Sequence, residues 1–100
     1  MRRNKYNAQI CEADGQRFRS KKERNYYLRL KEMQSNGEIL YFWSQVCFRL
    51  TGGIKYYVDF MVHYPNGDLR FIDVKGHKTQ VYKLKKKLVE AETPYKIEEV

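Results

Sequence analysis

The sequence of 100 residues lacks the features of several specialised protein classes. No apolar run approaches the roughly 20 residues that a membrane-spanning helix needs, and no apolar signal segment follows the basic start MRRNKYN. Internal repeats, low-complexity tracts and linkers are missing as well. We therefore expect one cytoplasmic domain over residues 1–100, with residues 1–8 as a loose basic arm and no contact with a membrane.

Cysteine is scarce, and its two copies are not spaced as metal ligands. Cys11 and Cys47 have no CxxC spacing and no paired His or Cys spacing. We interpret them as free thiols in a reducing compartment, in preference to a disulfide or a zinc site.

Acidic residues are in the minority, since 12 Asp and Glu face 20 Lys and Arg, which leaves a net charge of +8. This excess favours a polyanionic partner, because each contact with a phosphate releases condensed counterions. The charge alone does not separate nucleases from ribosomal or membrane-surface proteins.

Local signals predict an α/β fold in which a small mixed β-sheet is flanked by helices. Asp14-Gly15 is typical of a hairpin turn, and Ser20-Lys21-Lys22-Glu23 matches a capping box at a helix start. The expected elements, in chain order, are a hairpin over 9–18, a helix over 21–35, strands over 39–50, 55–64 and 69–75, a helix over 80–92 and a strand over 95–100. We expect a buried stripe on the second helix formed by Val81, Leu84, Leu88 and Ala91. We assign to the core, as a group, the aromatic residues Tyr26, Tyr27, Phe42, Trp43 and Phe60.

Two aspartates stand where strands usually avoid them. Asp59 interrupts an apolar strand, and Asp73 does the same in the next strand, two residues before Lys75. If both aspartates lie on one sheet face, two carboxylates converge beside an ammonium group, which suits Mg²⁺. Taken singly, Asp59 could equally be a satisfied buried polar group, and Asp73 with Lys75 a surface ion pair.

Glu23 has two competing explanations. It is the reciprocal residue of the capping box, but it also lies on the helix stripe that carries Tyr27 and Leu30. Because a carboxylate that only caps has no need of the core-facing stripe, we favour a functional role. Gln45 lies at an expected break in a strand, and we interpret it as a structural residue in preference to one that lines the site.

The motifs resemble the PD-(D/E)XK nuclease superfamily, and more closely a group of small phage-encoded endonucleases within it. The likeness covers almost the whole chain, through KYN, DGQRFRSKKE, NGEI, SQVCFRL, YYVDF, IDVKG, TQVYKLKKKL and YKIEEV. It implies a restriction-endonuclease-like core and metal-dependent hydrolysis of phosphodiester bonds in DNA. One departure is that Val58 stands where the motif often has proline.

The resemblance implies a role for each matching residue. The catalytic set is Glu23, Asp59, Asp73 and Lys75, and the backbone carbonyl of Val74 joins the three carboxylates as a metal ligand. Mg²⁺ is the expected cofactor, Mn²⁺ is expected to substitute, and no small-molecule cofactor is expected. We expect DNA contacts from Lys78, Thr79, Lys83, Lys86 and Lys87, although lysines on a helix are often only a solvated face.

Four-way (Holliday) junction resolvases of this superfamily act as dimers, so the resemblance implies a homodimer that cuts branched recombination or replication intermediates. For a phage-encoded protein the location is the host cytoplasm. Two alternatives remain open: a non-catalytic basic DNA-binding module that uses the same surface, and a structural or adaptor protein.

Overall fold

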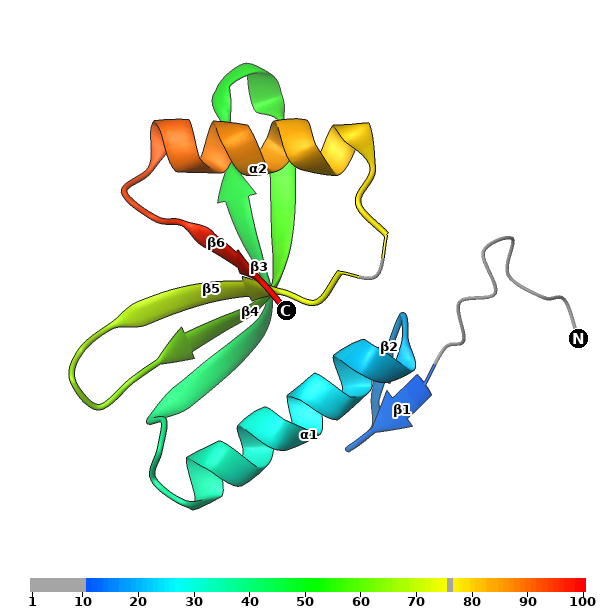
Figure 1. Cartoon of the computed structure of the whole chain (residues 1–100), viewed down its shortest axis with the longest axis vertical. Coiled ribbons are helices and arrows are strands. Elements are labelled where there is room, and N and C mark those ends of the chain that lie inside the picture. The colour runs from blue at the N-terminus through cyan, green and yellow to red at the C-terminus, as the bar shows by residue number, and fades with distance from the viewer. Residues whose placement is uncertain (1–10, 76) are drawn as a thin grey trace, which may run out of the picture.

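The structure, a computed structural model, describes residues 11–75 and 77–100. Its elements are β1 (Cys11–Ala13), β2 (Gln16–Phe18), α1 (Lys21–Ser35), β3 (Tyr41–Arg49), the short 3-10 helix η1 (Thr51–Gly53), β4 (Lys55–His63), β5 (Leu69–Asp73), α2 (Gln80–Glu92) and β6 (Ile97–Glu99) (Figure 1). The expected basic arm over 1–8 and the first two residues of the expected hairpin lie outside the described residues. Within the described part, neither helix has the length and apolar character needed to cross a membrane.

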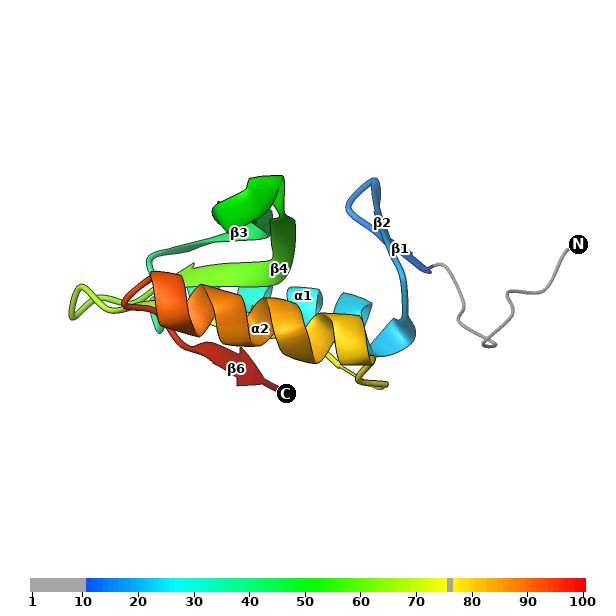
Figure 2. The same ribbon diagram turned by 90° about the horizontal axis from the view of Figure 1, so that it is seen from above.

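Four strands form one mixed sheet in the order β3-β4-β5-β6. The first three strands pair antiparallel, and β6 joins β5 in parallel. The hairpin of β1 and β2 makes a separate two-stranded sheet beside the first turns of α1 (Figure 2). This arrangement confirms the α/β class, the mixed sheet and the predicted order of elements.

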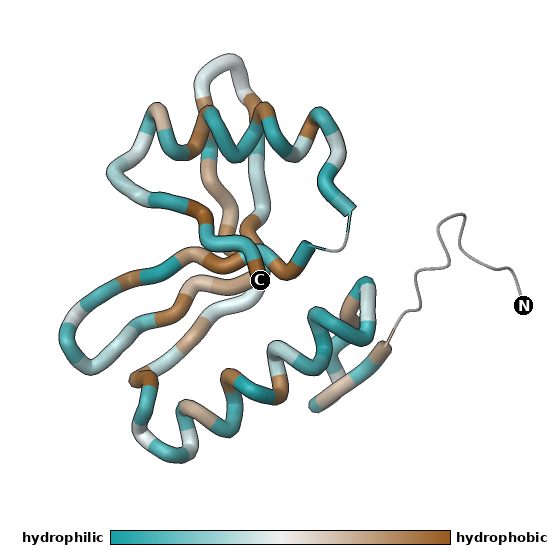
Figure 3. The backbone as a smooth tube through the Cα atoms, in the orientation of Figure 1, coloured by the Kyte–Doolittle hydropathy of each residue, from teal (hydrophilic) through white to brown (hydrophobic). Residues whose placement is uncertain are grey.

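The apolar residues form two clusters, one for each helix. Tyr27 and Leu30 of α1 pack with Phe60 in the first cluster, whereas Val89 of α2 packs with Val58 in the second. Strand β4 contributes to both clusters, since its first half faces α2 and its second half faces α1. Figure 3 shows the corresponding hydrophobic positions recurring along the strands and both helices, separated by hydrophilic ones.

The predicted start of α1 is confirmed. The Ser20 side chain accepts a hydrogen bond from the Glu23 backbone N–H at 3.1 Å, so the N-terminal half of the capping box forms. Glu23 is buried on the same stripe as Tyr27 and Leu30. The direction of the Glu23 side chain toward the core was therefore predicted correctly from the helical spacing.

The predicted buried stripe of α2 is wrong at three of its four positions, and only Leu88 is partly buried, against the second cluster. Val81 and Leu84 are 61% and 63% exposed and Ala91 is exposed, while Tyr82 and Val89 are buried. The inward face also carries the half-buried Lys86. A count of apolar residues misses such a face, because tyrosine and lysine bury long stems while their polar ends find partners.

Trp43 also departs from expectation, because it is 40% exposed on β3 and not in the core. The reason is the sheet order, because β3 is an edge strand in the part of the chain that the structure describes. Strand β5 ends at Asp73, two residues before the predicted end. Pairing continues past this point, since the Lys75 backbone N–H donates to the Val100 carbonyl at 3.3 Å.

Candidate active site

A row of polar residues crosses the four-stranded sheet. Asp73 of β5 pairs in register with Glu99 of β6. Asp59 of β4 lies opposite Asp73, because the two aspartates are the next residues beyond the antiparallel pair of Phe60 and Ile72. On its other side Asp59 lies opposite Gln45, at the one position where the β3–β4 pairing is interrupted. From β3 to β6, the row consists of Gln45, Asp59, Asp73 and Glu99. The sheet register therefore brings together the two aspartates that the sequence placed in neighbouring strands.

Hydrogen bonds between carboxylates and backbone lock Asp59 and Asp73 into this row. The Asp59 backbone N–H donates to Asp73 Oδ1 at 2.9 Å, and the Val74 backbone N–H donates to Asp59 Oδ2 at 2.8 Å. The side chains thus replace the ladder where the regular pairing of β4 and β5 ends. Each carboxylate accepts a charge-assisted hydrogen bond from a main-chain donor, a type roughly twice as strong as a neutral one.

Asp73 retains one unused oxygen. Its side chain is fully buried, and Oδ2 has no hydrogen-bond partner among the described residues. Desolvation by burial raises the pKa of Asp73, while the Asp59 amide and the charge of Lys75 oppose that rise. A buried carboxylate oxygen without a donor is costly unless a proton or a cation satisfies it.

Gln45 orients Asp59 from the other side. Its Nε2 donates to Asp59 Oδ1 at 3.3 Å, and its backbone has a φ of 54°, in the left-handed region. This conformation costs a non-glycine residue about 1 kcal/mol or more, so the strand carries local strain where Gln45 meets the aspartate. Gln45 therefore lines the site, which was the less favoured of its two interpretations, and the expected break in the strand marks the position where it contacts Asp59.

Glu23 completes a pair of acidic groups with Asp59. It is 6% exposed, and burial raises its pKa from an ordinary value of 4.5 to about 7, aided by the charge of Asp59 and a hydrogen bond with it. Two carboxylates this close in a partly dry site repel each other when both are ionised. A proton or a cation between them would relieve that repulsion.

The pair opens into a pocket of about 220 Å³. Besides Glu23 and Asp59, its walls include Gln45, Ser44, Arg17 and Arg19. Both arginines are exposed, and they place positive charge beside the acidic pair. Neither was predicted as a site residue, although the alternating RFR of the hairpin and its approach to Glu23 are visible in the sequence.

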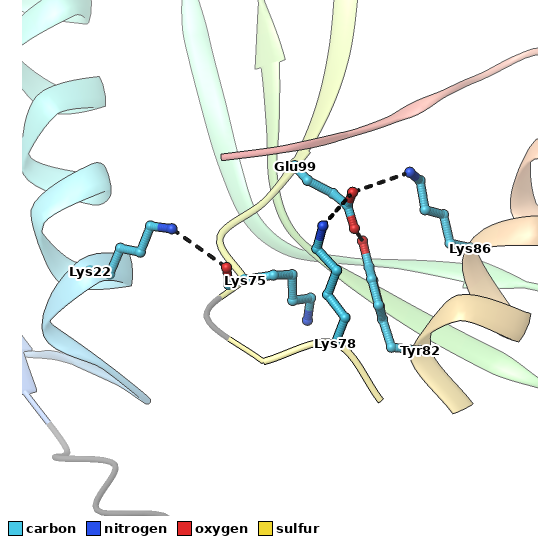
Figure 4. A network of polar contacts seen from close by, with 6 residues as sticks. All are labelled: Lys22, Lys75, Lys78, Tyr82, Lys86 and Glu99. Carbon is cyan, nitrogen blue, oxygen red and sulfur yellow. Dashed lines mark hydrogen bonds and ion pairs between the residues drawn. The ribbon is translucent and has the colours of Figure 1, made fainter. Parts of the chain in front are cut away.

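Lys75 does not line this pocket. Its Nζ lies 4.7 Å from the ring centroid of Tyr82, and its backbone carbonyl accepts a hydrogen bond from Lys22 Nζ at 3.5 Å (Figure 4). The amine is nevertheless close enough to Asp73 to lower the pKa of that carboxylate. The structure therefore places Lys75 beside Asp73 but directs its side chain toward α2.

Glu99 gathers the polar groups on the α2 side of the row. It accepts a hydrogen bond from the Tyr82 hydroxyl at 2.7 Å and pairs with Lys78 at 3.2 Å and Lys86 at 3.5 Å (Figure 4). The Tyr82 hydrogen bond, followed by the lysines, lowers the pKa of Glu99. Burial raises the pKa of Tyr82 far above its ordinary value, so the hydroxyl stays protonated and donates.

The residues predicted to contact DNA fall into three groups. Lys78 and Lys86 are engaged by Glu99, and Thr79 caps α2 by accepting the Tyr82 backbone N–H at 3.1 Å. Lys83 and Lys87 are exposed, and no ion pair involves them within the described ranges. These two lysines are therefore available to a phosphate without losing an existing partner.

No three His, Cys, Asp or Glu side chains in residues 11–75 and 77–100 lie close enough together to form a ready metal site. Two carboxylates in an open pocket still match the chemistry of Mg²⁺, which usually keeps several waters and takes one or two protein carboxylates. Glu23 and Asp59 are the two residues that meet this description.

No curated protein and no solved structure shows significant similarity to the chain. One family model, described as "Protein of unknown function (DUF1064)", matches residues 3–97, which include Glu23 and three of the four residues of the polar row, Gln45, Asp59 and Asp73. Because this match spans nearly the full length, the chain belongs to the DUF1064 family.

Proposed function

We propose that this chain is a metal-dependent endodeoxyribonuclease of the PD-(D/E)XK type. The observation that carries the proposal is the acidic group of Glu23, Asp59 and Asp73, drawn from a helix and two strands. Glu23 and Asp59 share an open pocket, and Asp73 adjoins Asp59 with a buried oxygen that no donor from the described residues satisfies. Costly buried acids that meet from distant parts of a chain are typical of a catalytic site.

Glu23 and Asp59 would hold a divalent cation, with Asp73 and the Val74 carbonyl as further candidate ligands. When bound, Mg²⁺ or Mn²⁺ supplies Lewis-acid polarisation of a phosphate oxygen and acidifies a water molecule. The residues themselves supply the negative charge, and Gln45 and the Val74 amide keep the Asp59 carboxylate oriented. The pair fits a cation because its two charges otherwise oppose each other in a buried setting.

Positive charge around the acidic pair would recruit the DNA backbone. Arg17 and Arg19 line the pocket, and Lys83 and Lys87 are exposed on α2. Lys75 adds charge beside Asp73, and its flexible four-carbon stem gives the amine reach toward a phosphate. In this proposal Lys75 stabilises the charge that develops on the phosphate during hydrolysis.

The finer fold assignment, a restriction-endonuclease-like core, belongs to the same proposal. So does a homodimer that cuts branched recombination or replication intermediates. A domain of 100 residues has little surface for reading a long sequence, which favours selection of DNA by its structure.

The second candidate function is a basic DNA-binding module without catalysis. Two observations favour it: Lys75 is directed away from the pocket, and no three-ligand metal site is preformed within the described ranges. The nuclease would cleave DNA and would need metal and Asp59 to do so, whereas the binding module would leave the DNA uncut.

The deciding experiment incubates the purified chain with plasmid, linear and four-way-junction DNA in Mg²⁺, Mn²⁺ or EDTA. We expect cleavage with either metal, none in EDTA, and none by Asp59→Asn or Lys75→Ala. Lys96→Ala, an exposed lysine outside the proposed contacts, serves as the matched control and should cut normally. Salt-sensitive binding without cleavage under any condition would reject the nuclease in favour of the binding module.

A further inference from the structure

A second pocket adjoins the Glu23–Asp59 pocket along the edge strand β3. It has a volume of about 310 Å³ and shares Gln16 and Ser44 with the first pocket. Its other walls are Tyr27, Lys31 and Gln34 from the hairpin-facing side of α1, and Tyr41, Phe42 and Trp43 from β3. Because two wall residues are common to both pockets, a ligand in one lies next to a ligand in the other.

Exposed aromatic rings form the outer wall of this second pocket. Tyr41 is 49% and Trp43 is 40% exposed, and their ring centroids lie 4.8 Å apart in an edge-to-face arrangement. Tyr27 and Phe42, which are buried, pack behind them. No strand formed by residues 11–75 or 77–100 covers this edge, and both outer rings are exposed among these residues.

The polar part of the pocket is neutral or basic. Gln16, Gln34 and Ser44 offer both donors and acceptors, Lys31 offers a positive charge, and no acidic side chain lines the pocket. Flat aromatic faces beside amide groups and a cation are the chemistry that recognises an unpaired nucleobase and its phosphate. The carboxylates of an acidic peptide would not stack on the aromatic rings, and the acyl chains of a lipid would not hydrogen-bond to the amides.

We propose that this second pocket binds an unpaired nucleobase of the DNA strand whose phosphate enters the Glu23–Asp59 pocket. The inference rests on the proposed nuclease function and specifies its substrate: DNA with unpaired nucleotides next to the cut. In a fully paired duplex each base is stacked inside the helix and cannot reach the rings of Tyr41 and Trp43. The pocket would thus select branch points, flaps or single strands over intact duplex.

Trp43 is the only tryptophan in the chain, so its fluorescence reports on this pocket directly. The first measurement titrates the full chain in EDTA, where no cleavage is expected, with three DNA probes. They are a single-stranded thymidine oligonucleotide, an abasic strand of the same length, and a blunt duplex. We expect stacking to quench Trp43 with the first probe only, because the other two offer charge without an accessible base.

The second measurement compares variants by fluorescence anisotropy of the labelled single strand. We expect Tyr41→Leu and Trp43→Leu to weaken binding about tenfold, as loss of one stacking platform does. Tyr57→Leu is the matched control, since Tyr57 is 52% exposed on the neighbouring β4, opposite Cys47, and lines neither pocket. It should bind within twofold of wild type.

The outcomes separate this inference from the proposed function. Unchanged Trp43 fluorescence at saturating single strand, or normal binding by both leucine variants, overturns the base site even if plasmid is cut. Quenching by the single strand without cleavage by any metal keeps the base site and rejects the nuclease. If the variants instead change the sedimentation of the free protein and leave DNA affinity intact, the edge pairs with a second copy and the inference fails.

Discussion

Asp59 and Asp73 face each other across β4 and β5, and the backbone N–H of Asp59 donates to the carboxylate of Asp73 at 2.9 Å. A second hydrogen bond runs in the opposite direction, because the backbone N–H of Val74, the residue after Asp73, donates to the carboxylate of Asp59. The separation of the two carboxylates is therefore set by main-chain geometry. Any change that keeps the hydrogen bonds while removing charge tests chemistry without moving the site.

The left-handed backbone of Gln45 predicts an unusual order of stability. Gln45→Ala and Gln45→Gly both lose the hydrogen bond to Asp59, but only glycine relieves the φ of 54°. We expect the glycine variant to be more stable than the alanine variant by about 1 kcal/mol in urea unfolding followed by circular dichroism. Equal stabilities would mean that the strand relaxes once the glutamine is removed.

The raised pKa of Glu23 makes stability depend on pH in a defined direction. A carboxyl group whose folded-state pKa is about 7 stabilises the fold while protonated, and this contribution is lost as pH rises from 4.5 through 7. The side chain of Glu23→Gln stays neutral at every pH. In EDTA, the free energy of unfolding of the variant relative to wild type should therefore be larger at pH 8 than at pH 4, by on the order of 1 kcal/mol. Glu32→Gln, an exposed position on the same helix, should show no such gain. A difference between wild type and Glu23→Gln that is the same at both pH values contradicts the prediction.

Divalent metal should stabilise the protein without any DNA. A cation bound only by the folded chain raises the midpoint of thermal unfolding, and at a tenfold excess over its Kd the expected rise is at least about 5 °C. Asp59→Asn removes one of the two pocket carboxylates and should abolish the rise at pH 8. Potassium chloride at equal ionic strength is the comparison salt, because it screens charge without supplying a divalent cation. An equal rise in wild type and Asp59→Asn would show that the metal binds elsewhere.

Tyr82→Phe tests the network around Glu99. The hydroxyl gives the largest contribution to the lowered pKa of Glu99, so its removal should raise that pKa, measured by NMR titration. A lowered folded-state pKa stabilises the protein above the ordinary value of 4.5, and this is lost as pH falls through the folded value. We expect the variant to lose about 1 kcal/mol at neutral pH, and Tyr95→Phe, an exposed control, to lose little. If the pKa of Glu99 were the same in Tyr82→Phe as in wild type, Lys78 and Lys86 alone would account for its lowering.

The two kinds of lysine on α2 should differ in DNA binding. Lys83→Ala and Lys87→Ala each remove an unpaired charge and should reduce the slope of log affinity against log salt by about 1. Lys86→Ala should change the slope less, because Glu99 already neutralises part of its charge. If all three variants kept the wild-type slope, the DNA would lie away from the outer face of α2.

Local signals accounted for most of the fold. Ser20 and Thr79 cap the helices as predicted, and the Asp14-Gly15 and 65–68 turns define the hairpins. The short turn after β4 also fixes the register of β5, which explains why two aspartates in successive strands end in one row. Such features depend on residues close together in the chain, where sequence patterns are most informative.

Features that depend on distant partners were not predictable. The side chain of Lys75 follows the ring of Tyr82, and that contact exists only once α2 has packed. Tyr82 on the inward face of α2 donates a hydrogen bond to Glu99, which lies in β6 beyond the loop that follows the helix. Likewise, the positive φ of Gln45 and the unsatisfied oxygen of Asp73 arise from the assembled sheet and have no local pattern.

Asp59 lies in β4 between Val58, which belongs to one apolar cluster, and Phe60, which belongs to the other. The polar row is thus a seam between two separately packed halves. Substitutions that reshape either half need not alter the spacing of the carboxylates, because backbone hydrogen bonds across the seam maintain it. A molecule divided in this way can diverge widely in its interior, as its sequence drifts, while the geometry of its acidic centre stays the same.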